Sequence, residues 1–343
     1  MVLISLMKKL RTLFYGMTHE HAPGKLQTLM RLKDKFDVVA VVDDRKVASL
    51  HFQDDTSWPE NFRTVSPEEA FDIPDIDVAF VEVTNADLMP IAAKFAERGV
   101  AMHCDKPCGE AMEPYRTILE TCRAKNVPFQ IGYMYRGNPA LQFAWKAVRS
   151  GMLGEIAFVE ADMNHDYGSE GYEKYIATFK GGILYNLGCH LVDMVLPMVK
   201  GELKGVVPMI GDAPGDPKGS RTNGAAVLRF EGTDVLIRTS SHMPGGILRR
   251  RLRIDGTNGT LEIRPIERFD GQSLTLEMTL KVASGGYGAG THVLDFGVLT
   301  DRYAAQLEDL AAIVRGDKPN DQDYDHDLRV HEVTLKACGV AVS

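Results

Sequence analysis

The first 135 residues alternate between short apolar runs and longer stretches whose apolar residues recur at helical spacing. The runs are rich in β-branched and aromatic residues, which predicts strands over 12–15, 38–42, 78–83, 100–103 and 128–131. The stretches between them predict helices over 23–35, 86–98 and 113–125, the first with Pro23 in its opening turn. Strands and helices that alternate in this way predict a parallel sheet with helices on its faces.

The pattern changes after Asn138. It predicts a helix over 139–149, a strand over 155–162, a loop rich in glycine and tyrosine, and a long apolar helix over 183–198. Further strands are predicted over 225–230, 234–240, 249–255 and 260–264, with a turn at GTNGT (256–260). Their mixed alternation indicates an antiparallel sheet with one covered face. Helices over 302–315 and 326–337 are predicted to close the chain.

These elements predict an α/β fold in two domains, which suits a chain of 343 residues. We place the boundary near residue 136. Residues 1–136 are expected to form a Rossmann-type domain on a parallel sheet, and residues 137–343 an α/β domain. The closing helices are free to pack back on the first domain.

Composition and charge exclude several classes of protein. A content of 44% hydrophobic and 25% charged residues is that of an ordinary globular protein. The net charge of −8, without any basic block, argues against a nucleic-acid partner. The apolar stretch 1–7 is too short to span a bilayer and lacks the features of a signal peptide, so we expect no membrane partner and a cytoplasmic location.

The five cysteines are irregularly spaced and odd in number, so a disulfide framework is not expected. Cys104 and Cys108 flank Pro107, but no second Cys/His pair follows at zinc-site spacing. We therefore predict no metal.

The first strand runs into the turn FYGMTHEHAPG (14–24). In a dinucleotide-binding turn the first, third and sixth positions carry glycine, and here they hold Gly16, Thr18 and His21. Backbone N–H groups at the start of the helix hold the phosphates in such turns, so side chains that point away do not block binding. A plain strand–helix turn without a ligand is the alternative.

An acidic residue, Asp43, ends the second strand. A carboxylate there accepts hydrogen bonds from the ribose hydroxyls and repels a 2′-phosphate, which favours NAD over NADP. Arg45 could accommodate that phosphate, so NADP stays open. His19 and Asp44 complete this set of candidate cofactor contacts.

Two further segments carry candidate chemistry. HCDKPCGE (103–110) follows the fourth strand, where Lys106 could bond a substrate oxygen; a solvated loop lysine is the alternative. In the helix over 183–198, Asn186 and His190 share one face and Asp193 lies a turn further on. An exposed histidine there can serve as an acid/base, with Asp193 orienting it; a buried core histidine is the alternative.

Together these segments resemble the Gfo/Idh/MocA family, which includes glucose–fructose oxidoreductase and inositol dehydrogenase, over nearly the whole chain. The family's acid-Lys-Pro motif matches Asp105, Lys106 and Pro107. Its Gly-Gly-x-x-x-Asp-x-x-x-His-x-x-Asp stretch matches 181–193, with Asn186 at the first aspartate. Thr84 and Asn85 stand where the family has a Pro-Asn loop against the cofactor.

The resemblance implies an NAD(P)-dependent oxidoreductase that transfers a hydride between nicotinamide and a sugar or polyol. It implies that Lys106 positions the substrate hydroxyl and that His190 takes or returns its proton, with Asn186 beside them. It also implies a large open, mostly antiparallel sheet in the second domain, through which a homodimer or homotetramer would form. Weaker candidates for sugar contacts are Tyr133, Tyr135, Arg136, His165 and Tyr167.

The departures from the family pattern leave alternatives open. Two of the three glycines are lost, and Asn186 cannot hold the negative charge that would raise the pKa of His190. One alternative is an NAD-assisted glycoside hydrolase or lyase, for which His19, Glu20 and His165 are spare acid/base groups. Another is a non-enzymatic nucleotide or sugar sensor, against which the retained Lys106 and His190 argue.

Overall fold

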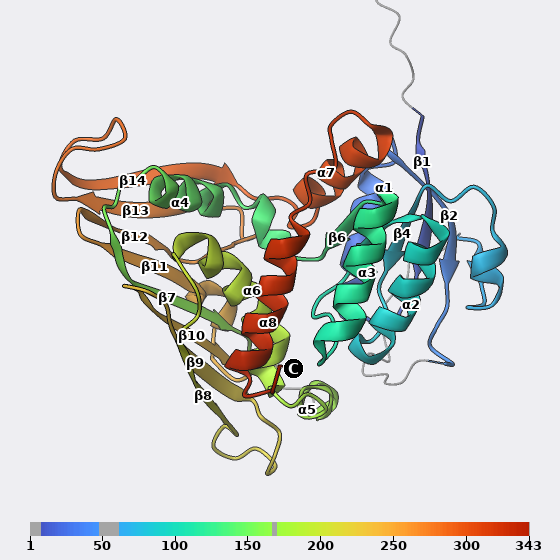
Figure 1. The fold of residues 1–343 in the computed structure, drawn as a ribbon, viewed down its shortest axis with the longest axis horizontal. Helices are drawn as coiled ribbons and strands as arrows, with labels where there is room; N and C mark the ends of the chain where they lie inside the picture. The colour runs from blue at the N-terminus through green and yellow to red at the C-terminus, as the bar shows by residue number, and fades with distance from the viewer. Residues whose placement is uncertain (1–7, 48–61, 167–169, 343) are drawn as a thin grey trace, which may run out of the picture. The chain divides into compact units, whose positions relative to one another are not determined.

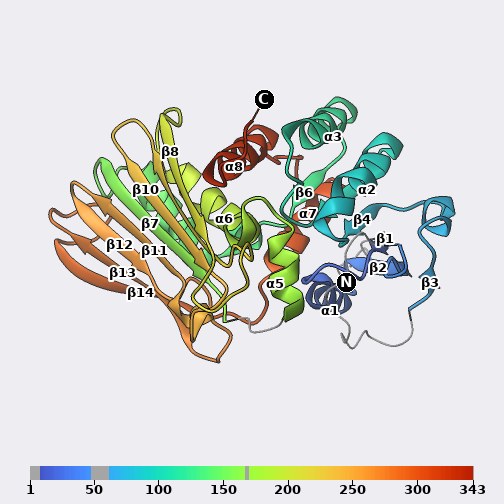
Figure 2. The ribbon, with the colours of Figure 1, turned by 90° about the horizontal axis from the view of Figure 1, so that it is seen from below.

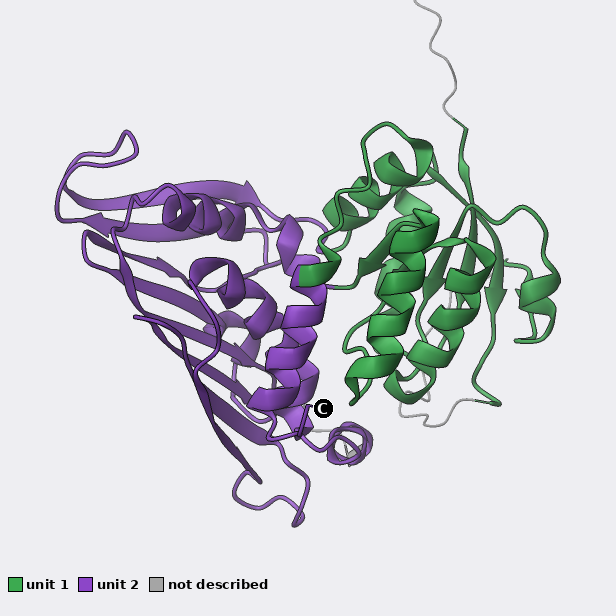
Figure 3. Ribbon diagram, in the orientation of Figure 1, with its two compact units in different colours: residues 1–132, 303–325 green, residues 133–302, 326–343 purple. Residues whose placement is uncertain are grey.

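The computed structural model describes residues 8–47, 62–166 and 170–342. The chain divides into two compact units, shown in Figure 3. The first comprises Met1–Gly132 and Tyr303–Asp325, and the second comprises Tyr133–Arg302 and His326–Ser343. Each unit is built around its own sheet.

The first unit contains a six-stranded sheet in which every neighbouring pair is parallel. Its spatial order is β3-β2-β1-β4-β5-β6. The strands are β1 (Leu10–Tyr15), β2 (Phe36–Val42), β3 (Thr64–Val65), β4 (Val78–Val81), β5 (Ala101–Cys104) and β6 (Phe129–Ile131). The parallel sheet expected from the sequence is thus confirmed.

Helices cover this sheet on both sides: α1 (Ala22–Arg31) on one face and α2 (Asn85–Arg98) and α3 (Met112–Lys125) on the other (Figure 2). All residues of β4 and β5 are buried, as the near-continuous apolar runs require. From β1 the chain turns first to β2 on one side and later to β4 on the other. The carboxyl ends of β1 and β4 therefore flank the point where ligands bind in such sheets.

The second unit contains an eight-stranded sheet in the order β14-β13-β12-β11-β7-β10-β9-β8. The strands are β7 (Ile156–Asn164), β8 (Gly205–Gly211), β9 (Asn223–Arg229), β10 (Asp234–Ser240), β11 (Arg251–Gly256), β12 (Gly259–Ile263), β13 (Ser273–Leu280) and β14 (Gly290–Val298). Only β7 and β10 pair in parallel among these strands. The large, mostly antiparallel sheet is confirmed.

Two helices pack on one face of this sheet (Figure 1): α4 (Pro139–Arg149) on β12 and β13, and α6 (Gly182–Val195) on β7, β9 and β10. A short 3-10 turn, η3 (Leu196–Met198), continues α6. The chain also forms α7 (Ala304–Arg315), in the first unit, and α8 (Tyr324–Ala337). No helix within the described ranges has the length and hydropathy needed to cross a membrane.

Three sequence expectations needed correction. The segment expected to be a loop contains the helix α5 (Glu170–Ala177). Strand β8 was not expected because Pro208 interrupts its pattern, but β8 is an edge strand, where proline is tolerated. Strands β13 and β14 were also missed; β14 contains two glycines and exposes six of its nine residues, so it lacks a clear apolar period.

Candidate functional site

The turn after β1 depends on glycine at its first position. Gly16 has φ of +107°, which L side chains rarely adopt. A Cβ atom at Gly16 would lie 2.6 Å from the carbonyl oxygen of Glu82, which follows β4. The retained glycine therefore brings the end of β1 close to the end of β4.

Asp44 fixes this turn from the end of β2. Its carboxylate accepts hydrogen bonds from the backbone N–H of Met17 at 2.7 Å and from the Thr18 hydroxyl at 2.5 Å. Thr18 thus directs its hydroxyl to Asp44. Asp43 is instead paired with Arg45 at 2.7 and 2.8 Å, and this hydrogen bonding holds the pKa of Asp43 below its usual value.

Two histidines of the turn, His19 and His21, are directed onto one carboxylate. His19 Nδ1 lies 3.2 Å and His21 Nδ1 lies 3.1 Å from Asp105 Oδ2. The N–H groups of Thr18 and Glu20 donate to no acceptor within the part of the chain that the structure describes. The turn therefore keeps backbone donors for a phosphate group, and the residues present fit a bound dinucleotide.

A buried charge cluster that the sequence analysis missed lies behind the turn. The Lys25 ammonium, on α1, is 2.8 Å from Glu82 Oε1 and 2.5 Å from Asp105 Oδ2. Burial alone would raise the pKa of Asp105, but His19, Lys25 and His21 outweigh it and hold that pKa well below the usual range. Burial raises the pKa of Glu82 well above its usual value. Lys25 gave no signal in the sequence because a lysine on a helix normally faces solvent.

One ring nitrogen each of His19 and His21 and a carboxylate oxygen of Asp105 lie within 4.8 Å of one another, a spacing that a metal could bridge. However, the Lys25 ammonium already touches this carboxylate. A divalent ion would meet a fixed positive charge there, so we assign the three side chains to hydrogen bonding. A second group with the same spacing, Glu173, Asp216 and His242, is held together by ion pairs.

Lys106 follows β5 and is buried. Its backbone N–H donates to Asp105 Oδ1 at 2.6 Å, and its ammonium lies 3.4 Å from Glu20 Oε1. Thr84 and Asn85 begin α2, where the Thr84 hydroxyl donates to Asp87 at 2.6 Å. The side-chain oxygen and nitrogen of Asn85 are buried without a hydrogen-bond partner among the described residues, as expected for a group that meets a ligand.

In the second unit, two glycines allow α6 to start in a crowded place. A Cβ atom at Gly181 would lie 2.5 Å from Cys338 Cβ, and Gly182 has φ of +53° beside Arg221. All fourteen residues of α6 are buried, including His190. A helix that is apolar on nearly every side is buried on every side, so the histidine is not exposed to bulk water.

His190 is surrounded by aromatic rings. The rings of Tyr133 and Tyr135 meet its imidazole edge-on, with centroids 5.8 and 5.3 Å away. One turn earlier, Asn186 donates from Nδ2 to the Tyr172 hydroxyl at 3.0 Å. Tyr172 lies on α5, which the sequence analysis took for a loop.

Two more polar residues that the sequence analysis missed hold Tyr135 in place. The Tyr135 hydroxyl donates to Glu267 at 2.6 Å and accepts from Arg250 at 2.8 Å. Arg250 is fully buried and also lies 3.0 Å from a ring nitrogen of His165. These residues lie in a segment rich in arginine, whose charges gave no indication of burial.

Asp193 does not orient His190. Its carboxylate accepts hydrogen bonds from Arg136 at 2.6 and 3.0 Å and lies 3.0 Å from His326 Nε2. Arg136 also donates to Asp327 at 2.6 Å, so its guanidinium lies between two carboxylates. Of the predicted substrate contacts, Tyr167 lies outside the described residues.

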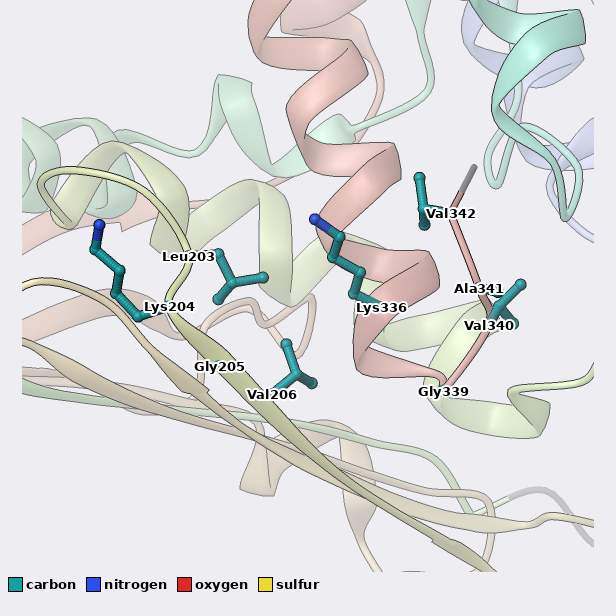
Figure 4. A pocket seen from close by; sticks show the side chains of 9 residues that line it. All are labelled: Leu203, Lys204, Gly205, Val206, Lys336, Gly339, Val340, Ala341 and Val342. Carbon is teal, nitrogen blue, oxygen red and sulfur yellow. The ribbon is translucent and has the colours of Figure 1, made fainter.

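One surface cavity of about 420 Å³ lies elsewhere in the second unit, between the start of β8 and the end of α8 (Figure 4). It contains none of the predicted site residues. Its lining comprises Leu203, Lys204, Gly205, Val206, Lys336, Gly339, Val340, Ala341 and Val342.

Two sequence models of known families match the chain. Residues 14–133 match the oxidoreductase family with an NAD-binding Rossmann fold, and residues 141–262 match the GFO/IDH/MocA C-terminal domain. The chain belongs to the Gfo/Idh/MocA family. The resemblance inferred from Lys106 and the segment 181–193 is therefore confirmed.

Individual relatives of this Gfo/Idh/MocA protein are distant. Levoglucosan dehydrogenase of Pseudarthrobacter phenanthrenivorans is 28% identical over 142 residues, 39% of this chain and 36% of the relative. Inositol 2-dehydrogenase of Rhizobium meliloti is 24% identical over 256 residues, 73% of each chain. Among solved structures, aldose–aldose oxidoreductase of Caulobacter crescentus has a TM-score of 0.73 at 20% identity, covering 97% of this chain and 98% of that one.

The chain spans between 31% and 38% of the length of the first three curated relatives. The TM-score of 0.73 to the solved structure supports a common fold, and at 20% identity it supports the fold alone. Membership in the family assigns the Rossmann fold of that family to residues 14–133.

Proposed function

We propose that this protein is an NAD-dependent dehydrogenase that oxidises a CH–OH group of a sugar or polyol, or reduces the matching ketone. The observation that carries the proposal is Lys106. It is a buried lysine at the carboxyl end of the parallel sheet, beside the glycine turn. A buried ammonium at that edge is suited to bind a substrate oxygen next to a nicotinamide.

In this proposal Lys106 orients the hydroxyl, and His190 exchanges its proton. The bound nicotinamide supplies the hydride acceptor. The aromatic rings of Tyr133 and Tyr135 hold the His190 imidazole and exclude water from it. Asn186 stands one turn before His190 and, unlike an aspartate, carries no negative charge.

The proposed cofactor is NAD, with NADP less favoured. Asp43 carries its charge at neutral pH because its pKa is lowered by hydrogen bonding to Arg45. The pair presents a carboxylate for ribose hydroxyls, and it engages the guanidinium that could otherwise bind a 2′-phosphate.

We further propose a homodimer or homotetramer that forms through the open face of the eight-stranded sheet. The protein is proposed to act in the cytoplasm, in keeping with five buried cysteines that form no disulfide among the described residues. Its substrate partner is a small carbohydrate.

A screen of NADH formation tests the function. Purified protein is incubated with NAD or NADP and a panel that contains myo-inositol, scyllo-inositol, levoglucosan, glucose and xylose, and absorbance is followed at the nicotinamide band. We expect NAD reduction with at least one alcohol. Lys106→Met should lower kcat at least a hundredfold, which is within the usual range for loss of a group that acts on the reacting atom. Lys200→Met, at an exposed lysine, is the control.

Two outcomes of the screen contradict the proposal. A glycoside that is cleaved without net NADH formation would favour the NAD-assisted hydrolase or lyase. A protein that binds NADH, oxidises nothing in the panel and is unaffected by Lys106→Met would favour a sensor.

A further inference from the structure

Three consecutive residues of the turn after β1 are acid/base groups that the proposed reaction leaves unused: His19, Glu20 and His21. Two of them, Glu20 and His21, lie in succession beside Lys106, with each polar atom within 4 Å of the next. The Lys106 ammonium lies 3.4 Å from Glu20 Oε1, and the same oxygen lies 3.6 Å from His21 Nε2. On its other side, His21 Nδ1 lies 3.1 Å from Asp105 Oδ2.

We propose that Glu20 and His21 form a proton relay that connects Lys106 to solvent during alcohol oxidation. This inference rests on the proposed function. It gives the substrate hydroxyl a second proton route besides His190, in a chain that has Asn186 where the family motif has an aspartate.

The exposure of the groups gives the relay its direction. The side chain of Lys106 is 0% exposed, while those of Glu20 and His21 are 11% and 13% exposed. A proton that passes from Lys106 to Glu20 and then to His21 therefore moves from a closed site to one that water reaches.

The transfer balances in atoms and electrons. A Nζ–H bond of Lys106 breaks as an O–H bond forms on Glu20, and the resulting amine accepts the proton of the substrate hydroxyl. The electron pair leaves the substrate carbon with the hydride, which the nicotinamide accepts. Glu20 then protonates His21 Nε2, and the imidazolium releases the proton to water, so one proton leaves for each alcohol oxidised.

The surroundings of His21 keep its ring neutral at pH 7. Burial lowers the pKa of His21 to about 4, although Asp105 and Glu20 work in the other direction and Lys106 works with burial. A proton that reaches Nε2 is therefore held only briefly and is released to water, while Asp105 stabilises the short-lived imidazolium. The other groups that face the ring are His19, with a centroid 5.0 Å away, and Tyr303, at 6.0 Å. Lys25 acts on it through their shared partner Asp105.

The first test needs no turnover. In protein labelled with ¹⁵N-histidine, we expect the His21 signal, identified by its loss in His21→Ala, to report a neutral ring with its proton on Nδ1 at pH 7. Glu20→Gln should shift the Nε2 resonance of His21 and leave that of His292, on β14, unchanged. The relay is overturned if the His21 ring carries its proton on Nε2, or if the Nε2 resonance of His21 is unchanged in Glu20→Gln. Either result can occur while the dehydrogenase proposal holds.

The second test uses the alcohol from the panel that wild-type protein oxidises fastest. Glu20→Gln and His21→Ala should each lower kcat at least tenfold with little change in KM for NAD, and free imidazole should restore kcat in His21→Ala. His292→Ala is the matched control and should be unchanged with or without imidazole.

Rescue by imidazole separates proton transfer from a purely structural role, which a diffusible base does not replace. An unchanged kcat in both variants, or a loss in His21→Ala that imidazole does not restore, contradicts the relay. If wild-type protein oxidises no alcohol, the proposed function fails by that result, and the histidine spectra alone decide whether the chain of groups exists.

Discussion

At the scale of single residues, the turn after β1 keeps its shape by means that differ from the usual glycine pattern. Gly16 allows β1 and β4 to approach, Asp44 binds the next two residues, and the histidines turn toward Asp105. The backbone donors thus stay available although two glycines are missing. A side chain need only point away from the ligand to be tolerated there.

Gly16→Ala tests the close approach. The new Cβ would press on the carbonyl of Glu82 in a backbone conformation that costs roughly 1–3 kcal/mol for a non-glycine residue. We expect lower thermal stability and at least tenfold weaker NADH binding by calorimetry. Gly151→Ala is the control because Gly151 has φ of +72° but open space around it. Equal effects in the two variants would show that the contact with Glu82 is unimportant.

The lowered pKa of His103, in the centre of β5, makes the stability of the folded protein depend on pH. Burial lowers its pKa from 6.5 to about 3, with Lys25 adding to the effect, and its Nδ1 lies 2.9 Å from Gln130 Oε1. Between these pKa values the unfolded chain binds a proton that the folded protein does not, so stability falls as the pH falls from 6.5 toward 3. His103 alone should account for about 2 kcal/mol between pH 7 and pH 5.

Urea denaturation at both pH values measures this loss, and His103→Gln should reduce it by about 2 kcal/mol. The variant keeps an amide that can donate to Gln130. A loss of stability that is the same in both proteins would mean that His103 does not carry the effect.

At the scale of elements, helices and strands with a clear period were predictable. Helix α4 and strand β10 begin and end where the sequence placed them. Strands β8 and β14 were not, because an edge position, a proline or repeated glycines weaken the alternation while neighbouring strands supply the hydrogen bonds. Strand β13 was missed although its buried and less buried residues alternate.

In the candidate site, too, some residues were predictable from the sequence and others were not. Lys106 and His190 were found because they stand in motifs, whereas Lys25, Glu82, Arg250 and Glu267 were missed. Their importance depends on burial and on partners far away in the sequence, such as Glu82, which lies 57 positions after Lys25. No local pattern reports such a pairing.

Arg136 connects its own segment to α6 and α8. We therefore expect its replacement to lower the stability of the protein strongly. Its guanidinium bonds Asp193 on α6 and Asp327 on α8, and both carboxylates are buried. Arg136→Met would leave two buried charges without their partner, which costs roughly 3–5 kcal/mol. Arg123→Met, which breaks an exposed pair with Asp325, should change the stability little. Similar denaturation midpoints for the two variants would contradict this account.

At the scale of the whole molecule, the eight-stranded sheet leaves one face without a covering helix in the described chain. Val207 and Met209 on the edge strand β8 are 59% and 51% exposed. They alternate with Val206, which lines the cavity beside α8, and so point to the opposite face. Exposed apolar side chains on a sheet face are typical of a contact between subunits.

Sedimentation tests the oligomer. Wild-type protein should sediment as a dimer or tetramer, and the double variant Val207→Glu, Met209→Glu should shift it toward monomer, because burying two carboxylates opposes association. Met30→Glu, at an exposed methionine on α1, should leave the assembly intact. A monomeric wild-type protein, or an oligomer that persists unchanged in the double variant, would contradict assembly through this face.

The most direct test of the central claim follows the hydrogen that is transferred. The alcohol identified in the screen is deuterated at its carbinol carbons and incubated with the protein and NAD, and the nicotinamide product is weighed by mass spectrometry. We predict NADH that carries one deuterium, in wild-type protein and in Lys200→Met, and almost none formed by Lys106→Met. Consumption of the alcohol without deuterium on the nicotinamide would contradict the assignment of this protein as a dehydrogenase of sugar or polyol alcohols.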